Sequence, residues 1–234
     1  MPLPVTILFD LDGTLLLTGG ASRRCILAAG RAVLGDRFHW GPITVGTLDW
    51  EIFLELAAHC GIESAEQSLE KYKARYLREL REDLARQPNA RALPGIRELL
   101  TELSLRNDVI LGLLTGNYRE GAVAKLQAAG LDPELFALGA FAEDGKRRAD
   151  LVGVALEQAS KLAGQSCDPA NVIIIGDTPR DIACAKETGC LVLAVATGKY
   201  SIEELSQYHP DRLVPDLADP EPLYDLIQAA TCHK

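Results

Sequence analysis

The sequence has little positive charge and no long apolar run. Its 234 residues include 24 lysines and arginines against 33 aspartates and glutamates, which gives a formal net charge of -9. This charge argues against nucleic acids and anionic membranes as main partners, although a local cation can still bind a small anionic substrate. No apolar run approaches the roughly 20 residues of a membrane-spanning helix, and the first residues do not resemble a secretion signal. We therefore expect a cytoplasmic protein that binds neither nucleic acid nor membranes.

Several common metal- and phosphate-binding motifs are also missing. None of the six cysteines belongs to a C-x-x-C pair, which argues against a zinc site and predicts reduced, packed thiols. A Walker loop is absent. A calcium-binding loop starting at Asp10 would need a glycine and a glutamate where the sequence has Leu15 and Ala21. The acidic residues near the start of the sequence therefore need another explanation.

Six runs of the sequence consist mostly of valine, isoleucine, leucine and other apolar residues. They are Val5–Asp10, Val109–Asn117, Leu135–Phe141, Asn171–Asp177, Leu191–Val195 and a shorter run near Arg212. Nearly continuous apolar runs are typical of strands covered on both faces. Helical patterns lie between most of these runs, and the alternation predicts an α/β fold with a doubly wound parallel sheet.

The segment from about Leu17 to Gln87 interrupts this alternation. Its three apolar patterns all have helical spacing, and it contains no strand-like run. We therefore predict an α/β core formed by residues 1–16 and 88–234, with a helical cap domain, residues 17–87, inserted after the first strand.

Polar residues gather where three of the predicted strands end. They are Asp10 and Asp12 after the first strand, Thr115, Gly116 and Asn117 after the second, and Asp177 and Asp181 after the fourth. Each group alone is compatible with an ordinary turn or helix cap. Ligands of open α/β sheets bind outside the carboxyl ends of the strands, so the three groups together predict one functional crevice.

The predicted crevice contains four carboxylates, which repel one another unless a cation lies between them. A donor set without histidine or cysteine favours a hard ion, and Mg²⁺ is the natural candidate. Mg²⁺ in proteins commonly shares a phosphate group. Asp10 can then attack phosphorus as a nucleophile, while Asp12 protonates the leaving oxygen and later activates water.

The stretches DLDGT, LLTGN and GDTPRD, in this order, resemble the haloacid dehalogenase-like hydrolase superfamily. The resemblance implies that superfamily's Rossmann-like core with a helical cap. It also implies Asp10 as the nucleophile and Asp12 as the general acid and base. Mg²⁺ would be bound by Asp10, the main-chain carbonyl of Asp12 and Asp177, with Asp181 close by. Thr115 would hold a phosphoryl oxygen, and we expect Gly116 and Asn117 to contribute to phosphate binding.

The sequence departs from the superfamily where a lysine or arginine is often found within a Lys-Pro-x-Pro stretch. Here the residues are Lys146, Arg147 and Arg148, without prolines. A cation is needed to hold Asp10 against the phosphoryl group. The phase of the following helix favours Arg148, and Lys146 is the alternative.

The expected function is hydrolysis of a small phosphorylated metabolite. The dehalogenases of the superfamily lack the second acid, so the presence of Asp12 indicates phosphoryl chemistry. Within that class the sequence looks most like phosphoglycolate phosphatases. The stretch VGTLDWEIF resembles their substrate loop, with Leu48 where a threonine would stand. Thr47 and Asp49 are therefore predicted to contact substrate, although Asp49 could equally cap the helix that follows it.

Two other functions use a similar set of residues. A phosphomutase of the β-phosphoglucomutase type would share the site and differ in its cap and in the lifetime of the aspartyl-phosphate. A phospho-accepting regulatory domain also combines acids, Mg²⁺, a threonine and a lysine on a doubly wound sheet. Its acceptor aspartate follows a middle strand and it has no inserted cap, so the order of motifs here argues against it.

Overall fold

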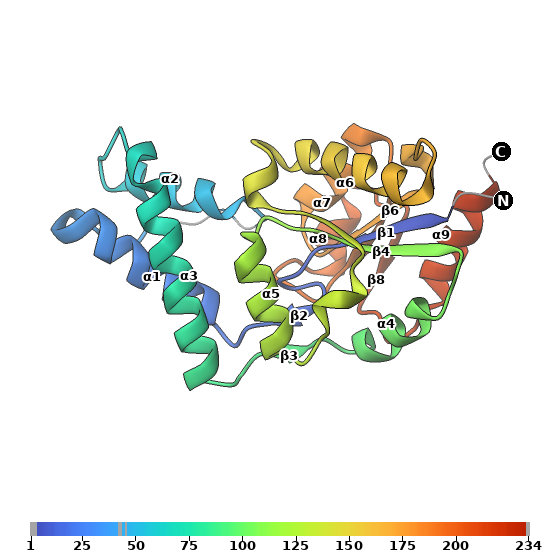
Figure 1. The fold of residues 1–234 in the computed structure, drawn as a ribbon, viewed down its shortest axis with the longest axis horizontal. Coiled ribbons are helices and arrows are strands. Elements are labelled where there is room, and N and C mark those ends of the chain that lie inside the picture. Colours follow the sequence, from blue (N-terminus) through green and yellow to red (C-terminus); the bar gives the residue numbers. More distant parts are fainter. Residues whose placement is uncertain (1–3, 42–43, 45, 233–234) are drawn as a thin grey trace.

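The computed structural model describes residues 4–41, 44 and 46–232. In this part of the chain a six-stranded sheet has the order β5-β4-β1-β6-β7-β8, and every pairing between neighbours is parallel. Figure 1 shows the sheet at the centre of the larger lobe. The strands are β1 Val5–Phe9, β4 Val109–Leu114, β5 Leu138–Ala140, β6 Val172–Gly176, β7 Leu191–Val195 and β8 Arg212–Val214.

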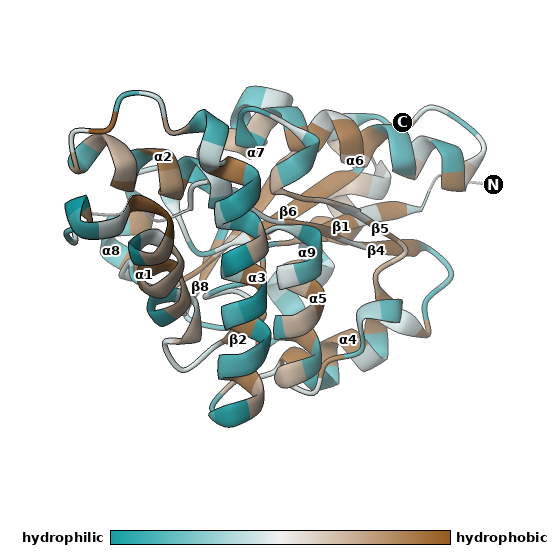
Figure 2. Ribbon diagram, turned by 60° about the vertical axis from the view of Figure 1, so that its left-hand side comes forward, coloured by the Kyte–Doolittle hydropathy of each residue, from teal (hydrophilic) through white to brown (hydrophobic). Residues whose placement is uncertain are grey.

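The central strand β1 separates two apolar cores. Successive side chains of a strand point to opposite faces, and accordingly Leu8 packs into one core whereas Ile7 and Phe9 pack into the other. All five residues of β1 are buried. Figure 2 shows the strands as mainly hydrophobic, as expected for a sheet covered on both faces.

Helices cover both faces of the sheet, which confirms the predicted doubly wound α/β fold. Apolar side chains of α4, α5 and α9 pack into the core that contains Phe9, and those of α6, α7 and α8 pack into the core that contains Leu8. The helices are α4 Ile96–Ser104, α5 Arg119–Ala128, α6 Arg148–Ala163, α7 Pro179–Thr188, α8 Ile202–Ser206 and α9 Glu221–Cys232. Single-turn 3₁₀ helices occupy Gly35–Arg37, Glu66–Ser68, Pro133–Leu135, Ala142–Asp144 and Pro169–Asn171.

The predicted helical insertion after the first strand is confirmed. The helices α1 (Ala21–Leu34), α2 (Asp49–His59) and α3 (Leu69–Arg86) lie to one side of the sheet. The chain enters and leaves this region through a short antiparallel ribbon, in which β2 (Leu16–Leu17) pairs with β3 (Arg91–Ala92). The division into a core, residues 1–16 and 88–234, and a cap, residues 17–87, stays a proposal. Both of its boundaries lie near this ribbon.

An aromatic row connects the cap with the core. The rings of Phe53 and Tyr72 stack with centroids 4.4 Å apart, and Tyr72 stacks in turn on Tyr76 at 6.0 Å. Tyr76 reaches Tyr118, the residue just before α5, at 6.5 Å. Aromatic side chains bury large apolar areas, so this row fixes the cap over the carboxyl ends of the strands.

Among the described helices, none combines the length and apolar composition needed to span a bilayer.

Candidate active site

A cavity of about 660 Å³ lies between the cap and the carboxyl ends of β1, β4 and β6. It is lined by most of the residues that the sequence predicts for the site, namely Asp10, Asp12, Thr47, Asp49, Thr115, Gly116, Asn117, Arg148 and Asp177. Asp181 does not line the cavity, but it is buried next to Asp10 and Asp177. The parallel topology explains this convergence, because it brings the ends of strands far apart in the sequence to one edge of the sheet.

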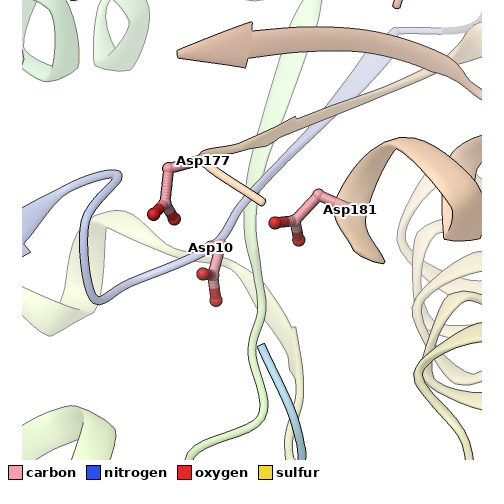
Figure 3. A group of neighbouring side chains, drawn as sticks. All are labelled: Asp10, Asp177 and Asp181. Atoms are coloured by element: carbon pink, nitrogen blue, oxygen red, sulfur yellow. The ribbon is translucent and has the colours of Figure 1, made fainter. Parts of the chain in front are cut away.

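One half of the site is a cluster of three buried carboxylates. Asp10 follows β1, Asp177 follows β6, and Asp181 lies in the first turn of α7; one oxygen from each lies within 4.8 Å of the others. Figure 3 shows the three side chains as neighbours, with Asp10 between Asp177 and Asp181. Asp181 is held in place by Thr178, whose N–H and hydroxyl donate to Oδ2 at 3.1 Å and 2.7 Å.

Two glycines let the backbone approach this cluster closely. A Cβ atom at Gly13, where φ is +88°, would lie 2.5 Å from Asp177 Oδ2, and one at Gly198 would lie 1.7 Å from the same oxygen. Any larger residue at either position would therefore displace the carboxylate. The two glycines therefore leave the room that the Asp177 carboxylate itself occupies.

Arg148 supplies the cation of this half of the site. Its Nη2 atom lies 3.1 Å from Asp10 Oδ1 and also contacts Asp181 Oδ1, and the side chain is buried. As the first residue of α6, Arg148 reaches back towards the sheet edge, where it donates to the carbonyl of Leu114 at 3.2 Å. Lys146, the alternative candidate, is exposed, and its main-chain N–H binds Asp150 instead.

Burial and mutual repulsion raise the pKa of Asp10 and of Asp177. Burial raises the pKa of Asp10 from 3.8 to about 6, although Arg148 opposes this, and Asp181 adds to the rise. Burial and repulsion from Asp10 and Asp181 raise the pKa of Asp177 to about 8. A buried set of oxygen donors with excess negative charge fits a hard divalent cation, because the cation removes the repulsion.

The other half of the site surrounds Asp12, whose side chain is 38% exposed and faces the cavity. The amide of Asn117 donates to Asp12 Oδ2 at 2.9 Å and to Thr115 Oγ1 at 2.8 Å. Lys125 Nζ lies 2.6 Å from Asp12 Oδ2 and also donates to Asn117 Oδ1. The side chain of Asp12 thus points to Lys125 and away from the three clustered carboxylates.

Sequence reasoning missed Lys125. It lies on α5 and its side chain is only 2% exposed. The available signal was its position on the apolar face of that helix, three residues after Ala122 and next to Leu126, both of which are buried. A lysine at such a position is almost never fully buried unless it is paired.

The start of α2 joins the cap to the core at the edge of the cavity. Asp49 Oδ2 accepts a hydrogen bond from the N–H of Tyr118 at 2.9 Å, and the N–H of Asp49 donates to the carbonyl of Gly116 at 2.7 Å. A Cβ at Gly116 would lie 2.3 Å from the carbonyl oxygen of Thr47, so the glycine permits this close approach. Thr47 is itself buried, and its hydroxyl donates to the carbonyl of Thr44.

The interpretation of Asp49 as a cap of its own helix is wrong. The helix begins at Asp49, and its N-cap is Leu48, whose N–H is bound at 3.1 Å by Glu51 of the first turn. The Asp49 carboxylate instead caps the start of α5 in the core, a contact between residues 69 positions apart. Burial raises the pKa of Asp49 to about 6, while Lys125 and the N–H of Tyr118 partly oppose the rise.

Comparisons with known proteins agree with this architecture. The family model described as haloacid dehalogenase-like hydrolase matches residues 7–195. Phosphoglycolate phosphatase from Synechococcus elongatus is 30% identical over 228 residues, which is 96% of each chain.

Solved structures show the same fold at low sequence identity. A predicted phosphoglycolate phosphatase from Haemophilus somnus has a TM-score of 0.70 at 20% identity, covering 95% of this chain and 98% of its own. CbbY from Rhodobacter sphaeroides, solved with phosphate, has a TM-score of 0.73 at 20% identity, covering 93% and 96%. β-Phosphoglucomutase from Clostridium difficile has a TM-score of 0.74 at 16% identity, covering 97% of both chains. With a family match over most of its length, this chain belongs to the haloacid dehalogenase-like hydrolases.

Proposed function

We propose that this protein is a Mg²⁺-dependent phosphatase that hydrolyses a small phosphate monoester through an aspartyl-phosphate on Asp10. The observation that carries the proposal is the different surroundings of Asp10 and Asp12. Asp10 lies in a buried acidic cluster beside Arg148, whereas Asp12 faces the cavity with its own hydrogen-bond donors. One acid is therefore suited to attack phosphorus and the other to transfer protons.

The residues fit the metal that the family implies. Asp10, Asp177 and Asp181, together with the main-chain carbonyl of Asp12, would hold Mg²⁺, because these are all oxygen donors and include no histidine or cysteine. When bound, the ion neutralises the clustered carboxylates and draws negative charge from the phosphoryl oxygens.

In the first step, a carboxylate oxygen of Asp10 attacks phosphorus while the bond from phosphorus to the ester oxygen breaks. The electron pair stays on the leaving oxygen, which takes a proton from Asp12 and departs as an alcohol. Arg148 holds Asp10 in position, and Thr115 lies at the end of β4 where its hydroxyl can bind a phosphoryl oxygen.

In the second step, water attacks the phosphorus of the aspartyl-phosphate. Asp12, now ionised, accepts a proton from this water, and the bond between phosphorus and Asp10 breaks. Inorganic phosphate leaves, and both aspartates return to their initial protonation states.

The cavity supports a small substrate with a second anionic group. The contact of Asp49 with Tyr118 closes the cap over the site, and a closed lid excludes large substrates and bulk water. Three further cations, Arg23, Arg91 and Lys199, line the same cavity. A phosphoglycolate-like ester carries a carboxylate that these side chains can bind, in agreement with the name of the Synechococcus relative. Thr47 and Asp49 are then the cap residues that limit the size of the substrate.

The proposal is tested by measuring phosphate release from a panel of phosphorylated metabolites with added Mg²⁺. We expect release from at least one small ester with a second anionic group, and Asp10→Asn should lower its turnover by about three orders of magnitude or more. Near wild-type release by Asp10→Asn would refute the mechanism. Conversion of a sugar phosphate to its isomer without phosphate release would identify a mutase instead.

A further inference from the structure

Lys125 is the one described cation that pairs with Asp12, and the mechanism above does not use it. We propose that Lys125 is a positioning residue for proton transfer: together with Asn117 it fixes the Asp12 carboxyl group and directs its acidic proton to Oδ1, the oxygen left for the substrate. This inference rests on the proposed phosphatase function.

The hydrogen bonds around Asp12 determine which oxygen can carry the proton. In the described part of the chain, both side-chain partners of Asp12, Lys125 Nζ and Asn117 Nδ2, bind Oδ2. An ammonium group and an amide nitrogen can only donate hydrogen bonds. When Asp12 is protonated, Oδ2 must therefore be the accepting carbonyl oxygen, and the proton lies on Oδ1.

Lys125 also determines which way the side-chain amide of Asn117 points. Lys125 Nζ donates to Asn117 Oδ1, so the amide nitrogen of Asn117 must face the opposite way. That nitrogen then donates to Asp12 Oδ2 and to Thr115 Oγ1. Without the ammonium group, the amide could rotate and place its oxygen against Asp12, where two acceptors would repel each other.

The burial of Lys125 argues against a direct role in binding substrate. Lys125 borders the cavity, but its side chain is only 2% exposed, against 38% for Asp12. Its ammonium group is held by Asp12 and Asn117. Helix α3 covers α5 on the cap side, and a Cβ at Gly121 would lie only 3.4 Å from Leu77. Lys125 therefore acts on the reaction through Asp12, whose exposed oxygen gives its proton to the leaving group and later takes one from water.

The test uses the dependence of catalysis on the leaving group. The value of kcat/KM covers the reaction up to cleavage of the ester bond. Cleavage of p-nitrophenyl phosphate releases a stable anion and needs little help from an acid, whereas an alkyl phosphate needs a proton from Asp12. For Lys125→Met, we expect kcat/KM to fall about 100-fold with the best alkyl substrate of the panel and less than about fivefold with p-nitrophenyl phosphate.

Leu126→Val provides a matched control on the same helix. Leu126 is buried in the core that contains Phe9 and does not line the cavity. Any loss of activity that comes only from loosening α5 should be equal for the two substrates. If Lys125→Met does not unfold cooperatively, the comparison is made with Lys125→Gln, which also removes the charge. A second check is the Asp12→Asn background, in which Lys125→Met should change neither rate by more than about twofold.

The outcomes separate the inference from the function on which it rests. Equal losses with both substrates would overturn the inference, because Lys125 would then act on the phosphoryl group or on the fold. An effect confined to KM would overturn it as well, since it would indicate a binding role. Wild-type protein that releases phosphate from neither substrate nor any other ester would refute the proposed function itself.

Discussion

The two aspartates of the first strand end are separated by one residue but have different surroundings. Asp10 is buried with two further carboxylates and one guanidinium group, that of Arg148. Asp12 is partly exposed and paired with one ammonium group, that of Lys125. When its acids are ionised, the half of the site that contains Asp10, Asp177, Asp181 and Arg148 (the Asp10 half) carries excess negative charge. In the half that contains Asp12, the charges of Asp12 and Lys125 balance each other. A divalent cation therefore stabilises the Asp10 half and is not needed beside the Asp12 side chain.

Metal removal should have the largest effect and should act only through the Asp10 half. We expect chelation to lower activity by about three orders of magnitude and added Mg²⁺ to restore it. Ca²⁺ should support little turnover, because it prefers more ligands at longer distances. A thermal-unfolding experiment gives a readout independent of activity: Mg²⁺ should raise the Tm of the wild type by mass action.

Variants in the two halves should differ in this thermal response. Asp177→Asn should abolish the increase in Tm with Mg²⁺, because it removes a proposed ligand. Asp12→Asn should retain the increase, since the Asp12 side chain lies outside the carboxylate cluster. An increase that survives Asp177→Asn, or full activity after exhaustive metal removal, would contradict the proposed metal site.

The next effect concerns the cation of the Asp10 half. Arg148→Ala should lower kcat/KM about 100-fold, because the guanidinium group holds Asp10 and counters charge on the transferring phosphoryl group. Lys146→Ala should stay within about twofold of the wild type, since Lys146 is exposed and its main-chain N–H, not its side chain, makes the contact with Asp150. The measurement is steady-state kinetics at saturating Mg²⁺. A larger loss of kcat/KM in Lys146→Ala than in Arg148→Ala would show that another conformation of the Lys146 side chain reaches the site.

The smallest effect is a pH dependence of stability that comes from the cap contact. Asp49 has a pKa of about 6 in the folded protein against 3.8 ordinarily, so the folded state holds its proton more tightly than the unfolded state. The stabilisation of the folded state that comes from this tighter proton binding is complete below about pH 4 and is lost as the pH rises to about 6. The free energy of unfolding of the wild type should therefore fall between pH 4 and pH 7. In Asp49→Asn this fall should be smaller, by at most about 3 kcal/mol.

This prediction is checked by urea unfolding of metal-free protein at a series of pH values. The side-chain amide oxygen that Asp49→Asn introduces can still accept the hydrogen bond of Tyr118, so the cap contact itself should persist. An unchanged pH dependence in Asp49→Asn would mean that the carboxylate is not buried in solution, and that the cap is open there.

The sequence predicted the strands and the convergence of Asp10, Asp177 and Asp181 at one edge of the sheet. The apolar runs and the helical patterns between them favoured a covered parallel sheet, and the strand ends of such a sheet meet at one edge. The short elements β2, β3 and α8 were not predicted, because two to five residues show no clear periodicity. Helix phase, which is a local property, favoured Arg148 over Lys146, and the Arg148 guanidinium does lie beside Asp10. The role of Arg148 in catalysis stays a prediction.

By itself, then, the sequence determined the fold class, the inserted helices and the meeting of Asp10, Asp177 and Asp181, because these depend on local patterns and on parallel topology. Only the tertiary structure decided the partners of Asp12 and Asp49. The contact of Asp12 with Lys125 joins residues 113 positions apart, and that of Asp49 with Tyr118 joins the cap to the core. Such pairs depend on how a helix is rotated against its neighbours and on how the cap is placed over the sheet, and neither is encoded in the spacing of residues along one segment.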